Sequence, residues 1–319
     1  MYGLYKNCKS CKGCSEKVMM KGACCHMEEM LLKTPCSVAE LVTALKGADT
    51  NTYLISGGTD LIIKLRKNRI YSGTMIDMKG IRSLEYIREE AGFVKLGANT
   101  TFIHIINSPV LQQYAACLVE AAGQIGSTQI RNVATVGGNI GNAFAGADCI
   151  PALMAMDAKV EVICSKGESY IKDIADIVIG SGKNSLKKDE AIIEIAFPIQ
   201  GNRCRTAFGK IGSRSRVTIA KINMAAFIKL DETEERIEEA RIFLGALGPK
   251  AFRSRIVEEA LVGRTVSLEL IHSFAEALTA QVDSAIAGRS SQEYKREAIR
   301  GLADEVFYKL FGDLLQEVK

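Results

Sequence analysis

The sequence lacks any long hydrophobic run. Nowhere in its 319 residues is there an apolar stretch of roughly 18 residues, the length that a transmembrane helix needs. The first residues also contain no apolar stretch of the kind found in signal peptides, because Lys and Cys interrupt them throughout. We therefore expect a cytoplasmic protein with no membrane partner.

Two common phosphate-binding motifs are absent as well. The chain has neither G-x-x-x-x-G-K-[ST] nor G-x-G-x-x-G, so neither a P-loop nor a standard Rossmann fingerprint is predicted. A strong excess of positive charge is also missing: the net charge is +4, and the first 36 residues hold six Lys against three Glu. The remainder is nearly neutral, so we expect no nucleic-acid partner.

The composition that is present suits a globular protein with room for two domains, because 47% of the residues are hydrophobic and 24% are charged. Strand and helix patterns are mixed over residues 31–203. From residue 204 onward, three strand patterns precede three helix patterns, which is typical of a separate α+β domain. We predict an α+β fold in three parts: a Cys-rich extension at 1–30, a first domain at 31–203 divided near residue 90, and a smaller domain at 204–319.

Local patterns predict many of the individual elements. S37-V-A-E40 has the form of a capping box, and Ser108-Pro109 predicts a helix that continues to about Ala122. Strands are predicted at 74–78, 93–98, 158–164, 191–198, 204–212, 217–230 and 236–247, and late helices at about 250–262, 266–287 and 290–316.

Two Gly-Gly turns follow short apolar stretches, S56-G57-G58-T59-D60 and T135-V136-G137-G138-N139. Because Gly has no Cβ, several backbone N–H groups can converge on an anion, and Thr59 and Thr135 can add hydroxyl donors. The helix predicted after the first turn would add its dipole. Each turn alone is also compatible with an ordinary tight turn. Together with the small-residue segment 125–148, the pair predicts a ligand with two linked phosphates, such as a dinucleotide.

Asp148 lies at the end of that small-residue segment. A carboxylate in such a segment can accept hydrogen bonds from ribose or ribityl hydroxyls. The alternative is that Asp148 caps the helix predicted for the PALMAM run that follows.

Three stretches carry a resemblance to a known family: L54-ISGGTD-L61, the run Q129-IRNVATVGGNIGNAFAGAD148 with C149-IPALMAMDAKV, and E190-AIIEIAFP. They are similar to the FAD-binding (medium) subunit of molybdenum hydroxylases, of the xanthine dehydrogenase and carbon monoxide dehydrogenase type. The similarity extends from about Leu31 to residue 310. Its T-[IV]-G-G-N segment, with an Asp thirteen residues after the Thr, is a specific signal.

The resemblance implies a two-part FAD-binding domain of the PCMH/VAO type, followed by the smaller α+β domain. It also implies that the first turn wraps the FAD diphosphate and that the second approaches the diphosphate and ribityl chain. Ile192 would lie near the isoalloxazine, Lys210 would point toward the flavin and raise its potential, and Ile125 occupies a position that is often aromatic. The implied cofactor-binding residues are Leu54, Ile55, Ser56, Gly57, Gly58, Thr59, Asp60, Leu61, Ile125, Thr135, Gly137, Gly138, Asn139, Asp148, Ile192 and Lys210.

The implied function is electron transfer within a multi-subunit enzyme. In the family, a molybdopterin-containing large subunit hydroxylates the substrate, and a small subunit passes electrons through 2Fe–2S clusters to this flavin and on to NAD or another acceptor. The chain shows no plant-type ferredoxin spacing and no pterin domain, so we expect those functions in partner chains. Two alternatives are a stand-alone FAD-dependent oxidoreductase, for which we identify no catalytic acid or base, and a non-enzymatic metal-binding protein.

The segment CKSCKGCSEKVMMKGACC, residues 8–25, lies upstream of this resemblance. It begins with C-x2-C-x2-C, the spacing with which three thiolates of one loop hold a cubane cluster. The candidate ligands are Cys8, Cys11, Cys14 and either Cys24 or Cys25. A 4Fe–4S cluster, a zinc ion and an unliganded segment are the alternatives. A cluster would add a route for electrons toward a ferredoxin-like acceptor.

Overall fold

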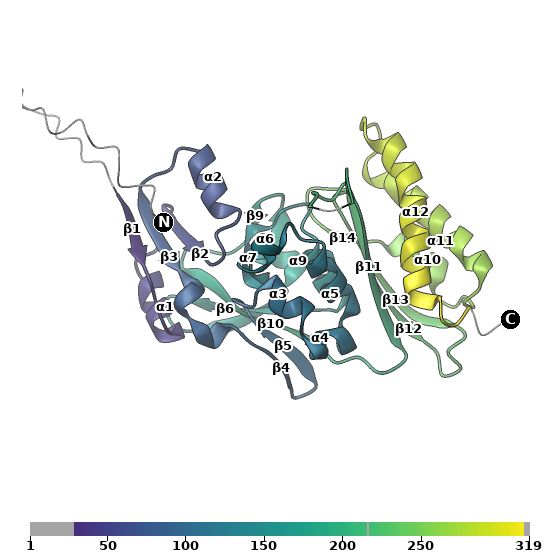
Figure 1. The fold of residues 1–319 in the computed structure, drawn as a ribbon, viewed down its shortest axis with the longest axis horizontal. Helices are drawn as coiled ribbons and strands as arrows, with labels where there is room; N and C mark the ends of the chain where they lie inside the picture. The colour runs from purple at the N-terminus through teal and green to yellow at the C-terminus, as the bar shows by residue number, and fades with distance from the viewer. Residues whose placement is uncertain (1–28, 216, 316–319) are drawn as a thin grey trace, which may run out of the picture.

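Three main sheets follow one another along the long axis of the molecule (Figure 1). The structure, a computed structural model, describes residues 29–215 and 217–315. The predicted metal ligands among residues 8–25 lie outside the described residues.

The first sheet is parallel and has the order β1-β3-β2. Its elements are β1 (Met30–Lys33), α1 (Val38–Leu45), β2 (Thr52–Ile55), α2 (Leu61–Lys67) and β3 (Gly73–Asp77). The predicted start of α1 is confirmed, since the Ser37 hydroxyl accepts from the Glu40 N–H at 3.2 Å. The Glu40 carboxylate in turn accepts from the Cys36 N–H at 2.8 Å, one residue earlier than in a regular capping box.

The second sheet is antiparallel and has the order β4-β5-β10-β6-β7. Its strands are β4 (Ile87–Glu90), β5 (Phe93–Gly97), β6 (Lys159–Cys164), β7 (Ser169–Asp173) and β10 (Glu190–Pro198), and two 3-10 helices, Met78–Gly80 and Arg82–Leu84, lead into it from the first sheet. The change from one sheet to the next therefore falls between Asp77 and Ile87. Strand β10 pairs with both β5 and β6, so the last strand of this region lies at its centre.

Short helices cover one face of the second sheet (Figure 1). They are α3 (Phe102–Ile106), α4 (Pro109–Tyr114), α5 (Ala116–Gly123), α6 (Thr128–Arg131), α7 (Val136–Asn142), α8 (Cys149–Ala155) and α9 (Ile174–Ile177), with a small hairpin of β8 (Val178–Gly180) and β9 (Lys183–Asn184). The single helix predicted from Ser108 to about Ala122 is wrong, because Ala115 leaves the helical region with φ −146° and ψ 53°. Ala115 is fully buried, and both α4 and α5 pack apolar residues against the same core. The apolar pattern in the sequence therefore continues past the break and reads as one helix.

The C-terminal sheet has the order β11 (Cys204–Ile211), β12 (Ile222–Leu230), β13 (Ile237–Gly245) and β14 (Phe252–Arg253). Its outer face is covered by α10 (Arg255–Leu261), α11 (Leu268–Ala285) and α12 (Gln292–Phe311) (Figure 1). Side chains alternate between its two faces. Phe208, Phe227 and Phe243 pack with the helices of the central region, whereas Met224 and Ile228 pack with α10–α12. The two parts of the chain therefore share one buried face of this sheet.

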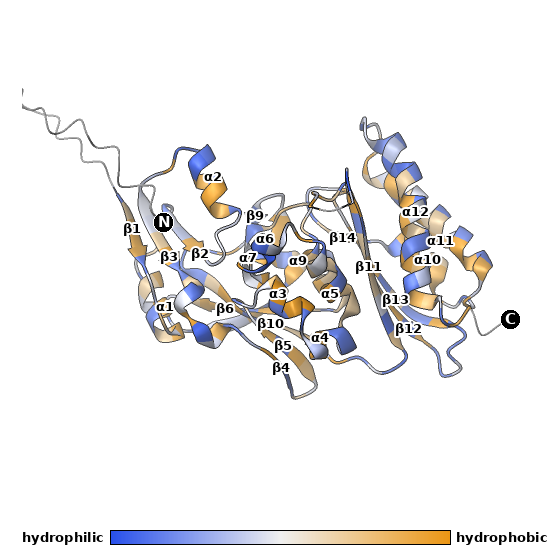
Figure 2. Cartoon of the chain, in the orientation of Figure 1, coloured by the Kyte–Doolittle hydropathy of each residue, from blue (hydrophilic) through white to orange (hydrophobic). Residues whose placement is uncertain are grey.

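Hydropathy follows this arrangement, since helix α3 and the strands of the central sheet are largely hydrophobic, while α2 and α12 are partly hydrophilic (Figure 2). Within residues 29–215 and 217–315, no helix combines the length and apolar character needed to cross a bilayer.

Candidate cofactor-binding site

A cavity of about 420 Å³ lies where the first sheet meets helix α7. Fourteen of the sixteen predicted cofactor-binding residues line it; the two that do not are Asp148 and Lys210. The predicted residues in the lining are Leu54, Ile55, Ser56, Gly57, Gly58, Thr59, Asp60, Leu61, Ile125, Thr135, Gly137, Gly138, Asn139 and Ile192. The fold therefore brings the two Gly-Gly turns to one cavity, although about 80 residues separate them.

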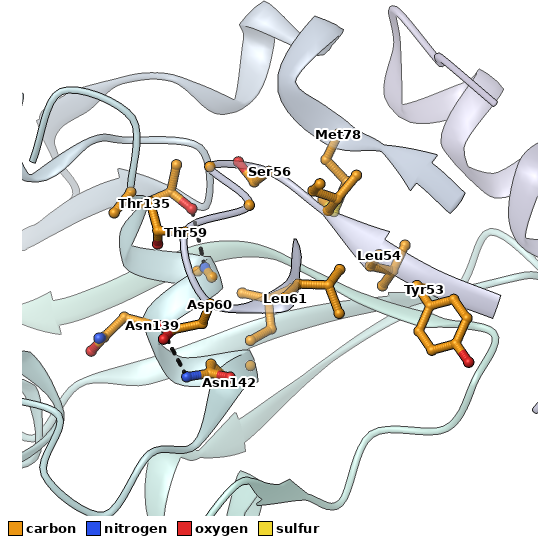
Figure 3. Close-up of a pocket in the computed structure, with 18 of the residues that line it drawn as sticks. Tyr53, Leu54, Ser56, Thr59, Asp60, Leu61, Met78, Thr135, Asn139 and Asn142 are labelled. Atoms are coloured by element: carbon orange, nitrogen blue, oxygen red, sulfur yellow. Dashed lines mark hydrogen bonds between the residues drawn. The ribbon is translucent and has the colours of Figure 1, made fainter. Parts of the chain in front are cut away.

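Direct backbone contact joins the two turns. A Cβ on Gly57 would lie 2.1 Å from the Val133 carbonyl oxygen and 2.8 Å from the Ala134 Cα, so only Gly fits at this point. The Asn142 amide in α7 donates to the Asp60 carboxylate at 3.2 Å, which ties the end of the first turn to the second (Figure 3). The cavity wall is thus formed by two segments packed against each other.

The first turn presents free backbone donors. In the part of the chain that the structure describes, the N–H groups of Gly57, Gly58 and Thr59 donate to no protein acceptor. Gly58 has φ 68°, a left-handed conformation that Gly adopts without strain. The Ser56 hydroxyl donates to Asn99 Oδ1 at 2.9 Å, and this bond anchors the turn to the interior of the molecule. Free amides of this kind are the donors that the predicted anion cradle requires.

The second turn differs from its prediction as an anion cradle. It forms the first turn of helix α7, and its amides are already used: the Gly137 N–H donates to the Ala98 carbonyl at 3.0 Å, and the Gly138 N–H donates to the Thr135 hydroxyl at 3.2 Å. Thr135 therefore acts as the N-cap acceptor of α7 (Figure 3), and its hydroxyl keeps an O–H donor that it can offer to a ligand. Of the two turns, only the first keeps glycine N–H groups without an acceptor among the described residues.

Asn139 adds a polar group that lacks a protein partner. Its Oδ1 atom is buried and accepts no hydrogen bond from the described residues, although the side chain lines the cavity. A buried acceptor without a donor costs about 1–3 kcal/mol, so such an atom points to a missing donor. Ribose and ribityl hydroxyls are donors of the right kind. The cavity therefore fits a ligand that has both phosphate and hydroxyl groups.

Three lysines that the sequence did not single out also line the cavity, and two of them, Lys64 and Lys188, have no acidic partner among the described residues. Lys64 lies on the same face of α2 as the lining residues Leu61, Leu65 and Asn68, a spacing that amphipathic helix geometry explains. Lys188 lies in the loop before β10. Among the described residues, no carboxylate lies within 4.0 Å of either ammonium group. Both charges therefore remain available to a phosphate.

The loop that carries Lys188 is held by Glu190, which is buried at the start of β10. The Glu190 carboxylate accepts from the Lys187 N–H at 2.9 Å, and the Lys187 ammonium lies 3.4 Å from its other oxygen. Helical spacing in the sequence places Lys64 on the same face of α2 as Leu61 and Leu65, so this signal could have identified Lys64 as a candidate. Lys188 comes from more than 100 residues later, and no local pattern connects it to the first turn.

Apolar side chains form another part of the wall. Phe102, Ile125 and Ile192 line the cavity. The segment that contains Ile125 is fixed by Arg131, whose Nη1 donates to the carbonyl oxygens of Ile125 at 3.0 Å and Gly126 at 2.9 Å. Such a wall excludes water and can cover the ring of an aromatic ligand.

Asp148 and Lys210 contact each other instead of lining the cavity. The Lys210 ammonium lies 2.5 Å from Asp148 Oδ2, and the two side chains are 4% and 5% exposed. Lys210 also donates to the Gln124 carbonyl at 3.1 Å, next to the lining residue Ile125, and the Asn223 amide donates to Asp148 Oδ1 at 2.8 Å. The C-terminal sheet thus holds the central region through a buried ion pair. The contact of either residue with a cofactor stays a prediction.

The alternative role of Asp148 as a helix cap is not observed. Asp148 occupies the N-cap position of α8, but its side chain makes no capping hydrogen bond. Burial raises the pKa of Asp148, while the Lys210 ammonium and the Asn223 amide oppose this effect by favouring the charged form.

No group of three or more His, Cys, Asp or Glu side chains is placed to hold a metal ion in residues 29–215 and 217–315. The predicted ligands Cys8, Cys11, Cys14 and Cys24 or Cys25 lie outside these ranges, so the proposal for them stays a prediction.

Comparisons with known proteins identify the family of this chain. The family model described as "FAD binding domain in molybdopterin dehydrogenase" matches residues 28–200, and that described as "CO dehydrogenase flavoprotein C-terminal domain" matches residues 207–310. The nicotinate dehydrogenase FAD-subunit of Eubacterium barkeri is 31% identical over 274 residues, which cover 85% of this chain and 90% of that protein. A putative xanthine dehydrogenase FAD-binding subunit of Escherichia coli is 30% identical over 255 residues, 79% of this chain and 86% of that one.

A solved structure gives the same result for the fold. A chain of carbon monoxide dehydrogenase from Hydrogenophaga pseudoflava superimposes with a TM-score of 0.80 at 25% identity, covering 89% of this chain and 98% of that chain.

Proposed function

This chain belongs to the family of FAD-binding medium subunits of molybdenum hydroxylases, and on that premise we propose that its cavity binds FAD and serves as an electron-transfer site. As a member of this family it is an oxidoreductase component. The single observation that carries the proposal is the first Gly-Gly turn: its residues with three free N–H groups line the same cavity as two lysines that have no acidic partner among the described residues.

Each type of group in the cavity would bind a different part of FAD. The N–H groups of Gly57, Gly58 and Thr59 would bind the diphosphate, with Lys64 and Lys188 offsetting its negative charge. The free Oδ1 of Asn139 would accept from a hydroxyl of the ribose or ribityl chain. Phe102, Ile125 and Ile192 would exclude water from the ring system. When bound, the flavin supplies the redox chemistry, and the protein supplies binding, orientation and electrostatics.

We further propose that the chain works in a cytoplasmic complex with a molybdopterin-containing large subunit and a 2Fe–2S small subunit. Electrons from the clusters of the small subunit would enter the flavin and leave to NAD or to a ferredoxin-like acceptor. The family resemblance supports this arrangement.

Reconstitution with FAD tests the binding proposal. We expect the purified chain to retain FAD with a flavin absorption spectrum. We expect the native protein to purify together with a larger partner chain that contains molybdenum and a smaller partner chain that contains iron. A chain that binds no FAD after reconstitution would overturn the proposal. A flavin-loaded chain that purifies without partners and turns over a substrate alone would instead support the stand-alone oxidoreductase.

For the N-terminal segment we propose a 4Fe–4S cluster held by Cys8, Cys11, Cys14 and one of Cys24 and Cys25, supported by the C-x2-C-x2-C spacing. A cluster there would offer electrons a second route, toward a ferredoxin-like acceptor. We expect about four iron and four acid-labile sulfide per chain, lost on substituting Cys11 with Ser. Comparing Cys24→Ser with Cys25→Ser identifies the fourth ligand, and zinc without sulfide would rule out the cluster.

A further inference from the structure

A second cavity lies in the C-terminal domain, where β12 begins, β13 ends and α12 begins. Its lining residues are Ala220, Lys221, Ala246, Ser290, Ser291, Tyr294 and Lys295, and none of them lines the first cavity. The antiparallel register pairs Asn223 with Gly245, which places the segment before β12 beside the segment after β13. Three parts of the chain that are distant in sequence therefore meet here.

The cavity is bordered by cations without acidic partners. The half-buried Lys295 ammonium donates to the Ala246 carbonyl at 2.7 Å, and the Lys221 ammonium lies 4.6 Å from the centroid of the Tyr294 ring. In the described ranges of the chain, no carboxylate lies within 4.0 Å of the cationic groups of Lys221, Lys295 or the neighbouring Arg289. Burial, followed by repulsion from Arg289 and Lys221, lowers the pKa of Lys295. A cation in this position lacks a counter-charge.

Hydroxyl donors complete the border. Ser291 occupies the N-cap position of α12 yet makes no capping bond, and Ser290 makes no side-chain hydrogen bond to the described residues. The helix predicted from about residue 290 begins at Gln292, and the two serines before it keep unused hydroxyls among the described residues. Glu293 is the acid of the first helical turn and is exposed. Positive charge and free hydroxyls thus outnumber negative groups at this cavity.

We propose that this cavity binds a phosphate group, held by Lys221, Arg289 and Lys295 with the hydroxyls of Ser290 and Ser291. A phosphate carries up to two negative charges and accepts several hydrogen bonds, which matches clustered cations beside hydroxyl donors. Lys295 is held by a carbonyl and Lys221 by an aromatic ring, so both cations are positioned before any ligand binds. The source is either inorganic phosphate or the diphosphate of a nucleotide.

The site does not depend on the proposed FAD function, because its residues are separate from the first cavity. Its test uses the full-length chain saturated with FAD, so that a phosphate site in the first cavity is filled. Inorganic phosphate, pyrophosphate and NADH are titrated against sodium chloride of equal ionic strength, with binding followed by calorimetry and by thermal unfolding. The test variants are Lys221→Gln and Arg289→Gln, both on exposed side chains. Arg300→Gln removes the same charge from an exposed position of α12 and is the control.

We expect inorganic phosphate to raise the unfolding temperature more than chloride does. Each of Lys221→Gln and Arg289→Gln should weaken phosphate binding roughly tenfold, the loss of one charge-assisted hydrogen bond, while Arg300→Gln binds as the wild type does. Weakened NADH binding in the same variants identifies a nucleotide as the source, and an effect on inorganic phosphate alone identifies the free ion. Equal stabilisation by phosphate and chloride overturns the proposal, as does equal weakening by all three variants.

Discussion

Replacing Lys210 with Met leaves Asp148 as a buried carboxyl without its cation. Their side chains are 4% and 5% exposed and the ion pair spans 2.5 Å, so water cannot take the place of the lost ammonium. Removing one partner of a buried pair costs about 3–5 kcal/mol. A second route gives a similar value, since keeping a carboxyl with an unfolded pKa near 3.9 protonated at pH 7 costs about 4 kcal/mol.

The same argument gives the pH dependence of this cost. Burial raises the pKa of Asp148 in the folded chain, and without Lys210 this effect loses its main opposing interaction. A group with a raised folded pKa stabilises the fold below the unfolded pKa, and this stabilisation is lost as the pH rises through the folded pKa. The penalty of Lys210→Met should therefore grow with pH, by about 1.4 kcal/mol per pH unit between pH 5 and pH 8, until Asp148 ionises.

Urea unfolding at pH 5, 6.5 and 8 measures this penalty, followed by far-UV circular dichroism because the chain contains no Trp. Lys229→Met is the matched control: Lys229 lies 2.9 Å from Glu238, but the two side chains are 34% and 47% exposed. It should cost about 0–1 kcal/mol at every pH. Adding Asp148→Asn to Lys210→Met should recover stability at pH 8. A penalty for Lys210→Met that is independent of pH, or no larger than that of Lys229→Met, would refute the reasoning.

Three further predictions concern the first cavity. Lys64→Gln and Lys188→Gln should each weaken FAD binding roughly tenfold at low salt and reduce its dependence on salt, while riboflavin, which has no phosphate, binds as before. Lys67→Gln, on the same helix as Lys64 but outside the lining, should have no effect. Equal effects on FAD and riboflavin would contradict a phosphate contact. Gly57→Ala should separate the two turns and lower both FAD affinity and unfolding temperature, because its Cβ would meet the Val133 backbone, whereas Gly123→Ala, whose Cβ meets nothing within 4 Å, should behave as the wild type does. Asn139→Leu should weaken FAD binding while leaving the FAD-free chain as stable or more stable by about 1 kcal/mol, since a buried acceptor without a donor is removed; a less stable FAD-free chain would show that Asn139 serves the fold alone.

Local chemistry in the sequence determined many of the elements and marked the first Gly-Gly turn as a candidate for anion binding. Ser37 with Glu40 marked the start of α1, and Ser108 with Pro109 marked the start of α4, because capping bonds form between residues three or four positions apart. The first Gly-Gly turn was recognised because the lack of a Cβ is a property of the residue itself.

The second turn shows where such reasoning ends. It has the same Gly-Gly pattern, but its amides are taken by Ala98 and Thr135, and Ala98 lies almost 40 residues earlier. Whether an N–H is free depends on every acceptor in its neighbourhood, and only the folded chain assembles those acceptors.

Tertiary structure also decided which charges meet. Lys188 reaches the cavity of Lys64 from more than 120 residues away, and Lys210 pairs with Asp148 across the boundary between the central region and the C-terminal sheet. The interaction of two charges depends on their distance and burial, which sequence separation does not encode. The sequence by itself therefore determined the family, many of the elements and the first turn. Packing decided which N–H groups and lysines stay without partners among the described residues, and it formed the buried ion pair.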